Sequence, residues 1–518
     1  MFFAVETWVA LEMRGSEWRG LTRAGPASWR VALVQRQQAM RAAVVGGGIA
    51  GLATAAALRR SGVAAVVYSE TIVKVSGSPL DAVGPLGLGL WTNALRCLEL
   101  LDPKALAALA AEGRWMGDAS YRTRDGRWIA GPSRPLAAGC ASGDPSMLFV
   151  SHQELQTTLE SLLPASAIIT HDSRVRRFES AEAGSTGLRL AFEDGSCSED
   201  SYDLIVGADG RGSAVRQQLA VEASARELMQ LTVGKRRLAS GDMTPHALQN
   251  MGYVVFRGLA HLQSQQQQQQ QPADAAAGVE SREGAAEGGG SSGSFQSWGG
   301  DGRRFATVPM SEGRHSWFAT VPVDSVESID GFDWKEPLGW LQRSFADWHD
   351  PIPTLLASSP PELVTWESAV AHRLERGGAE AGDQLLDLDM AHRGPQGACG
   401  VALVGDAAHT HDPLLAQGAG RAIEAAVGLA STVERWRAEK TIGGVRSPLQ
   451  SAIMEEAETQ RQRDALLQVV GDVAASMGQA GKVARYVLVR TQFIYTTAPH
   501  RTAHGAYVQY YVVRVAEL

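Results

Sequence analysis

The sequence is poor in cysteine and lacks the long apolar and basic segments that mark several classes of protein. It has four cysteines in 518 residues, without the spacing of a metal site or disulfide framework, so we interpret them as reduced thiols. No basic block predicts nucleic-acid binding, and the formal net charge of −8 is ordinary for a globular protein. The longest uncharged stretch, residues 42–58, contains four glycines, so it predicts a strand, a turn and a helix rather than a membrane span.

Three glycine-bearing segments, far apart in the chain, carry the functional signal. The first fits the pattern G-x-G-x-x-G as Gly46, Gly48 and Gly51, between an apolar run and an Ala/Leu-rich helix that begins near Ile49 and Ala50. In this pattern the first glycine permits a tight turn, the second lets the backbone approach a pyrophosphate, and the third lets the helix pack closely on the strand. The helix N-terminus then offers N–H groups to the phosphates.

An acidic residue follows the next predicted strand, residues 64–68. Glu70 stands about twenty residues after Gly51, the interval at which a carboxylate accepts hydrogen bonds from the ribose of the adenosine. A carboxylate there repels a 2′-phosphate, which disfavours NADP at this site. The alternative is a solvated surface acid, with Ser69 in the usual strand-end position.

The second segment, Asp209-Gly210, ends the apolar run 204–206 and precedes a basic, helix-like stretch. The third segment begins with Gly405-Asp406, which ends another apolar run, 401–404, and it continues through His409 and Pro413 to Gln417-Gly418. We expect Asp406 to accept a hydrogen bond from a sugar-alcohol hydroxyl.

The part of the third segment that follows Asp406 is a loop, and its sequence predicts a second helix start. Pro413 stiffens this loop, and Gln417, Gly418 and Ala419 lead into a helix at about residue 422. An N-terminus there stabilises negative charge on the pyrimidine ring of a reduced flavin. Three separate turns on one extended ligand favour FAD over a briefly bound nicotinamide.

Two histidines in this loop, His409 and His411, raise the alternative of a metal site. The sequence places no acid or thiol beside them with metal-ligand spacing, so we expect no metal. No acid–base triad is evident either, and the catalytic side chains stay unknown.

The remaining segments are less specific. Residues 225–390 contain strand-like pieces, such as 253–256 and 317–321, and we expect a sheet that covers the cofactor and shapes a substrate cavity. A glutamine-, glycine- and serine-rich insertion, residues 263–300, predicts a disordered surface loop. Residues 1–39 fit either a targeting segment or extra upstream sequence, because their arginines are accompanied by glutamates. The compartment is therefore open between cytoplasm and chloroplast.

These motifs make the sequence similar to the single-component, FAD-dependent monooxygenases of the aromatic-hydroxylase type, and within them to plant-type FAD monooxygenases. Residues 89–95, which include Asn93, resemble the family's flavin-proximal segment, and residues 345–353 resemble the segment that leads back from the substrate domain. The similarity spans roughly residues 41–435. His152 stands where the family usually has arginine near the cofactor, Ala416 replaces a usual glycine, and Gly420 replaces asparagine or cysteine.

The resemblance implies an α/β fold: a doubly wound, Rossmann-like FAD-binding domain, an inserted mixed-sheet substrate domain and a helical C-terminal region. The expected boundaries are 40–224 and 391–445 for the FAD-binding domain, 225–390 for the substrate domain and 446–518 for the C-terminal region. The resemblance also implies that NAD(P)H reduces FAD and that a C4a-hydroperoxyflavin, formed with O₂, hydroxylates or epoxidises a hydrophobic aromatic or isoprenoid molecule. Asp209-Gly210 would serve both FAD and the nicotinamide.

Two other functions stay open at this point. The same fold serves FAD-dependent reductases and desaturases, and a flavin-binding relative without turnover is the third alternative, since Ala416 and Gly420 lie near the expected flavin ring. The sequence leaves the substrate, the choice between NADH and NADPH, and the oligomeric state undetermined.

Overall fold

The computed structural model describes 14 segments of the chain, and two expectations lie outside them. The described residues are 40–70, 87–116, 121–130, 147–181, 187–222, 248–262, 295–299, 301–310, 313–327, 332–372, 399–439, 449–479, 493–494 and 512–513. The N-terminal extension, 1–39, and most of the predicted insertion, 263–294, fall outside this set.

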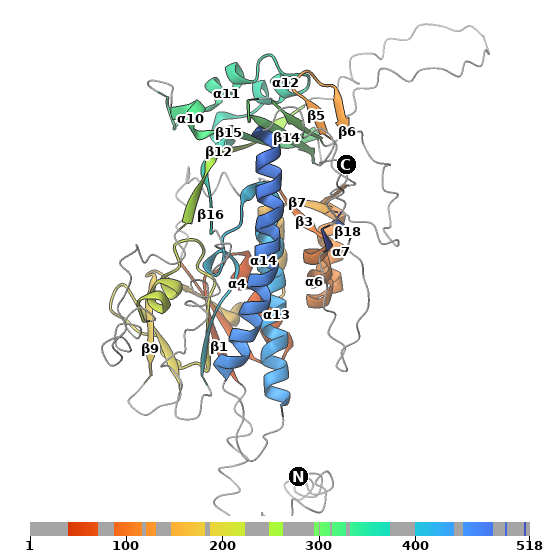
Figure 1. The fold of residues 1–518 in the computed structure, drawn as a ribbon. Coiled ribbons are helices and arrows are strands. Elements are labelled where there is room, and N and C mark those ends of the chain that lie inside the picture. The colour runs from red at the N-terminus through yellow and green to blue at the C-terminus, as the bar shows by residue number, and fades with distance from the viewer. Residues whose placement is uncertain are drawn as a thin grey trace, which may run out of the picture.

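A five-stranded parallel sheet forms the first layer, with strand order β17-β11-β1-β2-β8 (Figure 1). Its strands are β1 (Arg41–Val45), β2 (Ala64–Glu70), β8 (Ile168–His171), β11 (Leu204–Gly207) and β17 (Gly400–Leu403). The central strands are nearly continuous apolar runs, as expected where both faces of a parallel sheet are covered. Residues 42–58 form β1, a turn and α4 (Ile49–Arg60), as predicted.

Alternate residues of β1 face two different cores. Ala42 and Val44 pack with α4 and with α13 (Gly418–Ala438), whereas Ala43 and Val45 pack with the hairpin β9 (Val175–Ser180) and β10 (Leu188–Phe192). The sheet is therefore covered by helices on one face and mainly by this hairpin and the helical residues 214–222 on the other. The period of two along β1 produces this division.

A seven-stranded sheet forms the second layer, in the order β16-β12-β15-β14-β13-β5-β6. Its strands are β5 (Tyr121–Thr123), β6 (Trp128–Ala130), β12 (Leu248–His261), β13 (Phe295–Trp298), β14 (Arg304–Pro309), β15 (Arg314–Pro322) and β16 (Thr365–His372). The short helices α10 (Val323–Glu327), α11 (Leu338–Ser344) and α12 (Ile352–Ala357) cover its outer face, at the top of Figure 1. The strands predicted at 253–256 and 317–321 lie in β12 and β15.

A smaller three-stranded sheet connects the two layers, in the order β3-β7-β4. It consists of β3 (Gly87–Trp91), β4 (Arg114–Met116) and β7 (Met147–Ser151). Two helices, α6 (Thr92–Leu101) and α7 (Pro103–Glu112), lie between β3 and β4 in the chain, and α8 (His152–Ser161) follows β7. Ser151 caps α8 through a reciprocal capping box with Glu154.

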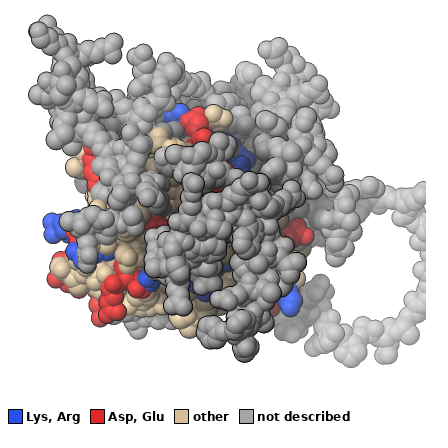
Figure 2. All heavy atoms as spheres, turned by 90° about the horizontal axis from the view of Figure 1, so that it is seen from below, with Lys and Arg blue, Asp and Glu red and all other residues tan. Residues whose placement is uncertain are grey.

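The C-terminal part is dominated by α14 (Leu449–Gln479), which lies alongside α13 in Figure 1. Gly428 permits this approach, because a Cβ there would lie 2.2 Å from Glu456 Oε1 on α14. Among the described helices, none combines the length and the apolar composition that crossing a membrane requires. On the face drawn in Figure 2, the described acidic and basic residues are interspersed.

Three sequence-based boundaries need correction. Residues 121–130 were expected in the FAD-binding domain, but β5 and β6 extend the second sheet. Residues 295–298, assigned to the disordered insertion 263–300, form β13, because backbone pairing with β14 and β5 fixes them. The region 446–518, expected to be helical, also contains the paired strands β18 (Phe493–Ile494) and β19 (Val512–Val513).

Candidate functional site

The three glycine-bearing segments converge at the carboxyl edge of the parallel sheet. β1 lies between β11 and β2, so chain order reverses there, and ligands of open parallel sheets bind at such a point. Ala208 N donates to Val45 O at 2.8 Å, and Val404 N donates to Gly207 O at 2.9 Å. A Cβ on Gly405 would lie 2.7 Å from Ala50 Cβ at the start of α4. Neighbouring strands thus bring the first, second and third segments together.

The glycines of the first segment differ in what surrounds them. Gly46 has φ +112°, and a Cβ there would lie 2.4 Å from Ala208 O. A Cβ on Gly51 would lie 1.8 Å from Gly46 O, so the helix start packs directly on the turn. A Cβ on Gly48 would meet no atom of the described residues within 4 Å. These surroundings are compatible with the turn, close-packing and approach roles of a pyrophosphate-binding loop, which stay a prediction.

The N-cap residue of α4 is Gly48, which provides no side-chain cap. The first turn of the helix, which includes Ile49 and Ala50, has no acidic residue. Both features favour an anionic ligand at a helix N-terminus.

The second segment combines a helix cap with an unused oxygen. Asp209 Oδ2 accepts a hydrogen bond from Ala214 N at 2.7 Å, while Asp209 Oδ1 is buried with no partner among the described residues. Gly210 has φ +75°, and a Cβ there would meet no atom within 4 Å in the described part of the chain. A buried acceptor without a partner is costly, so this oxygen fits a ligand hydroxyl.

Arg216, which the sequence reasoning did not single out, joins the second segment to the third. Its Nη1 donates to the carbonyl oxygens of Asp406 at 3.1 Å and Ala407 at 2.9 Å. Burial lowers the pKa of the Arg216 guanidinium, and Asp209 and Asp406 oppose that shift. The sequence signal that could have indicated Arg216 is its place as a basic residue on the predicted helix after Asp209-Gly210.

Asp406 lies in a short 3-10 turn, residues 405–407, directly after β17. Burial raises the pKa of its carboxyl, and His411 and Arg211 partly oppose the increase. The contact of Asp406 with a sugar alcohol stays a prediction, since a hydrogen-bond donor beside a partly buried carboxylate favours its ionised form.

The loop after Asp406 returns to the sheet edge through a second 3-10 turn, residues 413–415, which begins at Pro413 and is capped by Asp412. α13 then begins at Gly418 and Ala419, with Gln417 at its cap position and no acidic residue in its first turn. A Cβ on Gly418 would meet no described atom within 4 Å. The helix therefore starts four residues earlier than the position of about 422 that the sequence predicted.

Ala416 is the one described non-glycine residue with positive φ, at φ 49° and ψ 35°. The family's usual glycine suits this left-handed conformation, which costs alanine about 1–2 kcal/mol. Since glycine loses more conformational entropy on folding, we expect Ala416→Gly to raise the free energy of unfolding of the apoprotein by about 0.5–1 kcal/mol.

Urea denaturation of the apoprotein measures this change. Ala408→Gly is the matched control, since Ala408 has right-handed helical geometry and glycine should lower stability there. Equal effects of the two substitutions would contradict the strain at Ala416.

Asn93, at the start of α6, is buried against α13. Its Nδ2 donates to Glu424 Oε2 at 3.1 Å and lies 3.5 Å from Gln417 Oε1, while its Oδ1 has no partner among the described residues. A Cβ on Gly420 would lie 3.5 Å from Ala94 Cβ, which is ordinary van der Waals contact.

Glu70 and His152 come from two other elements, the end of β2 and the start of α8. Glu70 ends β2 with a half-exposed carboxylate that pairs with Arg174 Nε at 3.1 Å, while a Cβ on Gly47 would lie 2.3 Å from Ser69 Oγ. The ribose role of Glu70 stays a prediction, with Ser69 as the alternative. His152 is the first residue of α8, and burial followed by the charge of Arg257 lowers its pKa. Gln156, another residue that sequence reasoning missed, has its Nε2 3.5 Å from Gly47 O.

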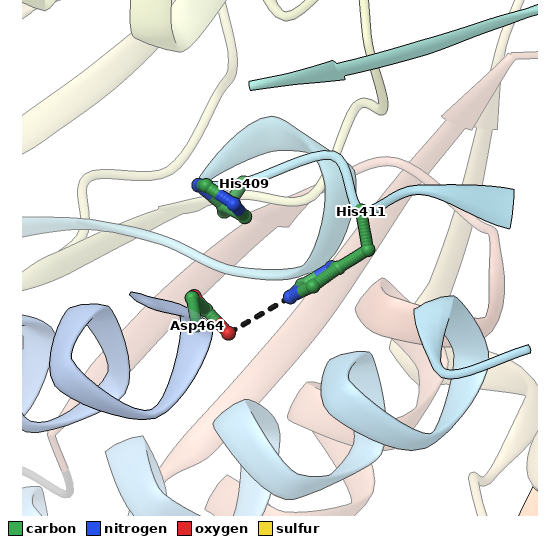
Figure 3. A group of neighbouring side chains, drawn as sticks. All are labelled: His409, His411 and Asp464. Atoms are coloured by element: carbon green, nitrogen blue, oxygen red, sulfur yellow. Dashed lines mark hydrogen bonds and ion pairs between the residues drawn. The ribbon is translucent and has the colours of Figure 1, made fainter. Parts of the chain in front are cut away.

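The two loop histidines have an acidic neighbour that the sequence did not reveal. Asp464 on α14 approaches them, and its Oδ1 lies 2.8 Å from His411 Nε2 (Figure 3). The same oxygen accepts from Arg421 Nε at 2.9 Å, and a guanidinium there repels a cation. Burial also lowers the pKa of His409 to about 3, so its ring is neutral. The premise that no acid lies nearby was wrong, but the absence of a metal stays our prediction.

The second sheet contacts the same sheet edge through one face. The Tyr253 hydroxyl on β12 donates to Asp412 Oδ1, and Gly87 N on β3 lies 3.4 Å from Ser316 Oγ on β15. At the end of β16, His372 and Thr410 exchange hydrogen bonds of 2.8 and 2.9 Å. This face of the second sheet is therefore fixed to the third segment and to β3.

The cofactor that these residues fit is FAD. Three kinds of feature lie on segments that meet at one edge: the glycines Gly48, Gly210 and Gly418, two helix starts without a side-chain cap, and the oxygens of Asn93 and Asp209 that have no partner among the described residues. Such an arrangement defines a flavoprotein of the dinucleotide-binding class.

Comparison with known proteins gives the family. Residues 39–314, more than half of the chain, match the family model described as FAD binding domain. The chain belongs to this family, and it is an FAD-dependent oxidoreductase of the single-component monooxygenase type. The aromatic-hydroxylase resemblance is thereby confirmed.

Two curated relatives are monooxygenases. The aurachin C monooxygenase/isomerase of Stigmatella aurantiaca is 28% identical over 390 residues, which cover 75% of this chain and 79% of that protein. The 3-amino-4-hydroxybenzoate 2-monooxygenase of Streptomyces cremeus is 29% identical over 387 residues, covering 74% and 76%. A solved structure with a similar fold is Klebsiella pneumoniae HpxO with FAD and uric acid, at TM-score 0.55 and 21% identity, covering 86% of this chain and 90% of that one.

Proposed function

We propose that this protein uses NAD(P)H and O₂ to hydroxylate or epoxidise a hydrophobic, ring-bearing small molecule, aromatic or isoprenoid. The observation that carries the proposal is the face of the second sheet that Tyr253 and Ser316 fix against the third segment and β3. Bound there, FAD would supply the oxygen-transfer chemistry, and the protein's task is to bind, orient and exclude water.

The side chains on this face suit a ring with a polar substituent. Because side chains alternate along a strand, Val255 and Arg257 share the face of Tyr253, and their cross-strand neighbours are Thr320 and Phe318. Val255 and Phe318 offer apolar contact. Arg257 Nη2 pairs with Glu367, but its Nε is buried without a partner among the described residues and can donate to a substituent.

The relatives support this substrate class. Their names identify aurachin C, 3-amino-4-hydroxybenzoate and urate as substrates, all of them ring compounds. We infer that this chain acts on a molecule of the same general kind.

Each predicted cofactor contact has a proposed role. The turn at Gly46, Gly48 and Gly51 with the start of α4 would hold the pyrophosphate, and Asp406 would accept from the sugar alcohol. Asp209 and Gly210 would lie beside the phosphates and the nicotinamide, and the α13 start would face the flavin ring. We also infer that the five-stranded sheet is the doubly wound dinucleotide-binding fold, on the strand order at β1.

An absorbance spectrum of the purified protein, followed by an NAD(P)H-oxidation screen against aromatic and isoprenoid compounds, tests the proposal. Substrate-stimulated oxidation with O₂ uptake supports it. O₂-independent turnover would indicate a reductase or desaturase instead. A yellow protein without turnover across the screen would indicate a flavin-binding relative.

A further inference from the structure

A group of buried charged side chains links α14 to the loop of the third segment. Its acidic members are Glu424 and Asp464, its basic members are Arg421 and Arg463, and His411 lies beside them. The side chains of Arg421, His411 and Asp464 are only 4%, 7% and 8% exposed. Removing one member of such a group leaves an uncompensated buried charge, so their mutual positions are tightly determined.

One oxygen of Asp464 contacts both the third segment, at His411, and the first turn of α13, at Arg421. Oδ1 accepts from His411 Nε2 at 2.8 Å and from Arg421 Nε at 2.9 Å. In Figure 3, His411 and Asp464 point toward each other from the loop and from α14. Burial alone would raise the pKa of the Asp464 carboxyl, but Arg421 and His411 outweigh burial and lower it. Asp464 is therefore ionised at neutral pH.

The partners of Asp464 stand on either side of the residues proposed to face the flavin. His411 precedes Pro413, and Arg421 lies in the first turn of α13, after Gln417 and Gly418. A change in the Asp464 side chain would therefore release both ends of this segment together.

Arg421 extends the contacts to the flavin-proximal segment. Its Nη1 donates to Glu424 Oε2 at 2.6 Å, and the same oxygen accepts from Asn93 Nδ2 at 3.1 Å. Arg463, the residue before Asp464, donates to the other Glu424 oxygen at 2.6 Å. Hydrogen bonds thus run from α14 to the Asn93 amide, whose Oδ1 has no partner among the described residues.

We propose that Asp464, on the C-terminal helix α14, is a positioning residue of the FAD site, which it sets through His411 and Arg421. The inference rests on the proposed placement of the α13 start at the flavin. It gives α14 a function in the cofactor site although α14 lies outside the matched family domain.

The test is the FAD affinity of Asp464→Asn, measured by flavin fluorescence quenching on titration of the apoprotein. Loss of one charged hydrogen-bonding partner predicts a dissociation constant raised about tenfold or more. The flavin midpoint potential should also shift to a more positive value, because a negative charge behind the α13 start is removed and the anionic reduced flavin is stabilised. A role confined to stability would lower the folded fraction without moving the potential.

The matched control is Glu455→Gln, which removes an exposed carboxylate from the same helix and should leave both measurements unchanged. His411→Asn breaks the contact from the other side and keeps the Arg421–Asp464 pair. His411→Asn should also raise the dissociation constant for FAD. If Asp464→Asn does not fold, His411→Asn provides the test instead. The double variant should lose less FAD-binding free energy than the two single variants lose when their losses are added, because the two residues act as a unit.

Wild-type FAD affinity and potential in folded Asp464→Asn would overturn the inference, as would full additivity with His411→Asn. Failure of the proposed function appears differently. In that case the wild-type protein would bind FAD but would show no substrate-stimulated NAD(P)H oxidation with O₂ uptake, while the FAD affinity and potential of Asp464→Asn would still change.

Discussion

Asp406→Ala is expected to lose most of its bound FAD. The predicted contact is a charged hydrogen bond to the sugar alcohol, and losing such a bond costs about 1.5–3 kcal/mol, or roughly ten- to hundredfold in affinity. The flavin absorbance of the purified variant, relative to its protein absorbance, measures the occupancy directly.

The same substitution should not weaken the apoprotein. Burial raises the pKa of the Asp406 carboxyl, so the folded state holds its proton more tightly than the unfolded chain does. Its contribution to stability is favourable below the unfolded pKa and is lost as the pH rises through the folded value. At neutral pH the ionised carboxylate is therefore a cost, and alanine should leave the urea midpoint of the apoprotein unchanged or raise it.

Asp194→Ala, at the exposed turn after β10, controls for the removal of an acidic residue and should retain FAD. Full flavin absorbance in Asp406→Ala would show that the third segment does not bind the cofactor as proposed. A loss of both flavin and apoprotein stability would instead point to a structural role for Asp406.

The parts of the fold that the sequence predicted are those set by local pattern. The apolar run before Gly46, the Ala/Leu-rich helix after it and the strand that ends at Glu70 each have a signal within a few residues. They therefore appear as β1, α4 and β2 close to the expected positions. The helix after Gln417 was predicted for the same reason, although it starts at Gly418 and not at about 422.

The parts that escaped prediction depend on contacts between distant residues. Arg216 reaches the carbonyl of Asp406 across 190 positions, and Tyr253 reaches Asp412 across 159. No local periodicity encodes such a pair. Asp464 was missed because α14 brings it to His411 from 53 residues away.

The sequence did not predict that β5 and β13 belong to the second sheet, because this too depends on contacts between distant residues. β5 and β13 have only three and four residues, and each is held by its pairing with the other. A short strand in a parallel pair takes its conformation from its neighbours more than from its own sequence. The division between the FAD-binding and substrate parts therefore cannot be drawn as single cuts in the chain.

The second large prediction concerns two glycines of the first segment, Gly51 and Gly48. A Cβ would clash with the backbone at Gly51 but would meet no described atom within 4 Å at Gly48. Gly51→Ala would place a Cβ 1.8 Å from Gly46 O, a backbone atom that cannot move without disturbing β1. We expect a loss of about 3 kcal/mol in the free energy of unfolding, with or without FAD. Gly48→Ala would place its Cβ in open space, so apoprotein stability should change by about 0.5 kcal/mol or less.

FAD binding should distinguish the two variants as well, because Gly48→Ala should weaken FAD binding although it leaves the apoprotein stable. If a pyrophosphate approaches the backbone at Gly48, the added methyl occupies that approach, and Gly48→Ala should bind FAD roughly ten- to hundredfold more weakly while remaining stable. Urea unfolding of the apoprotein and flavin titration of the folded protein give the two quantities for each variant. A stable Gly48→Ala protein with unchanged FAD affinity would place the pyrophosphate elsewhere, because open space at Gly48 has a function only if a ligand approaches it.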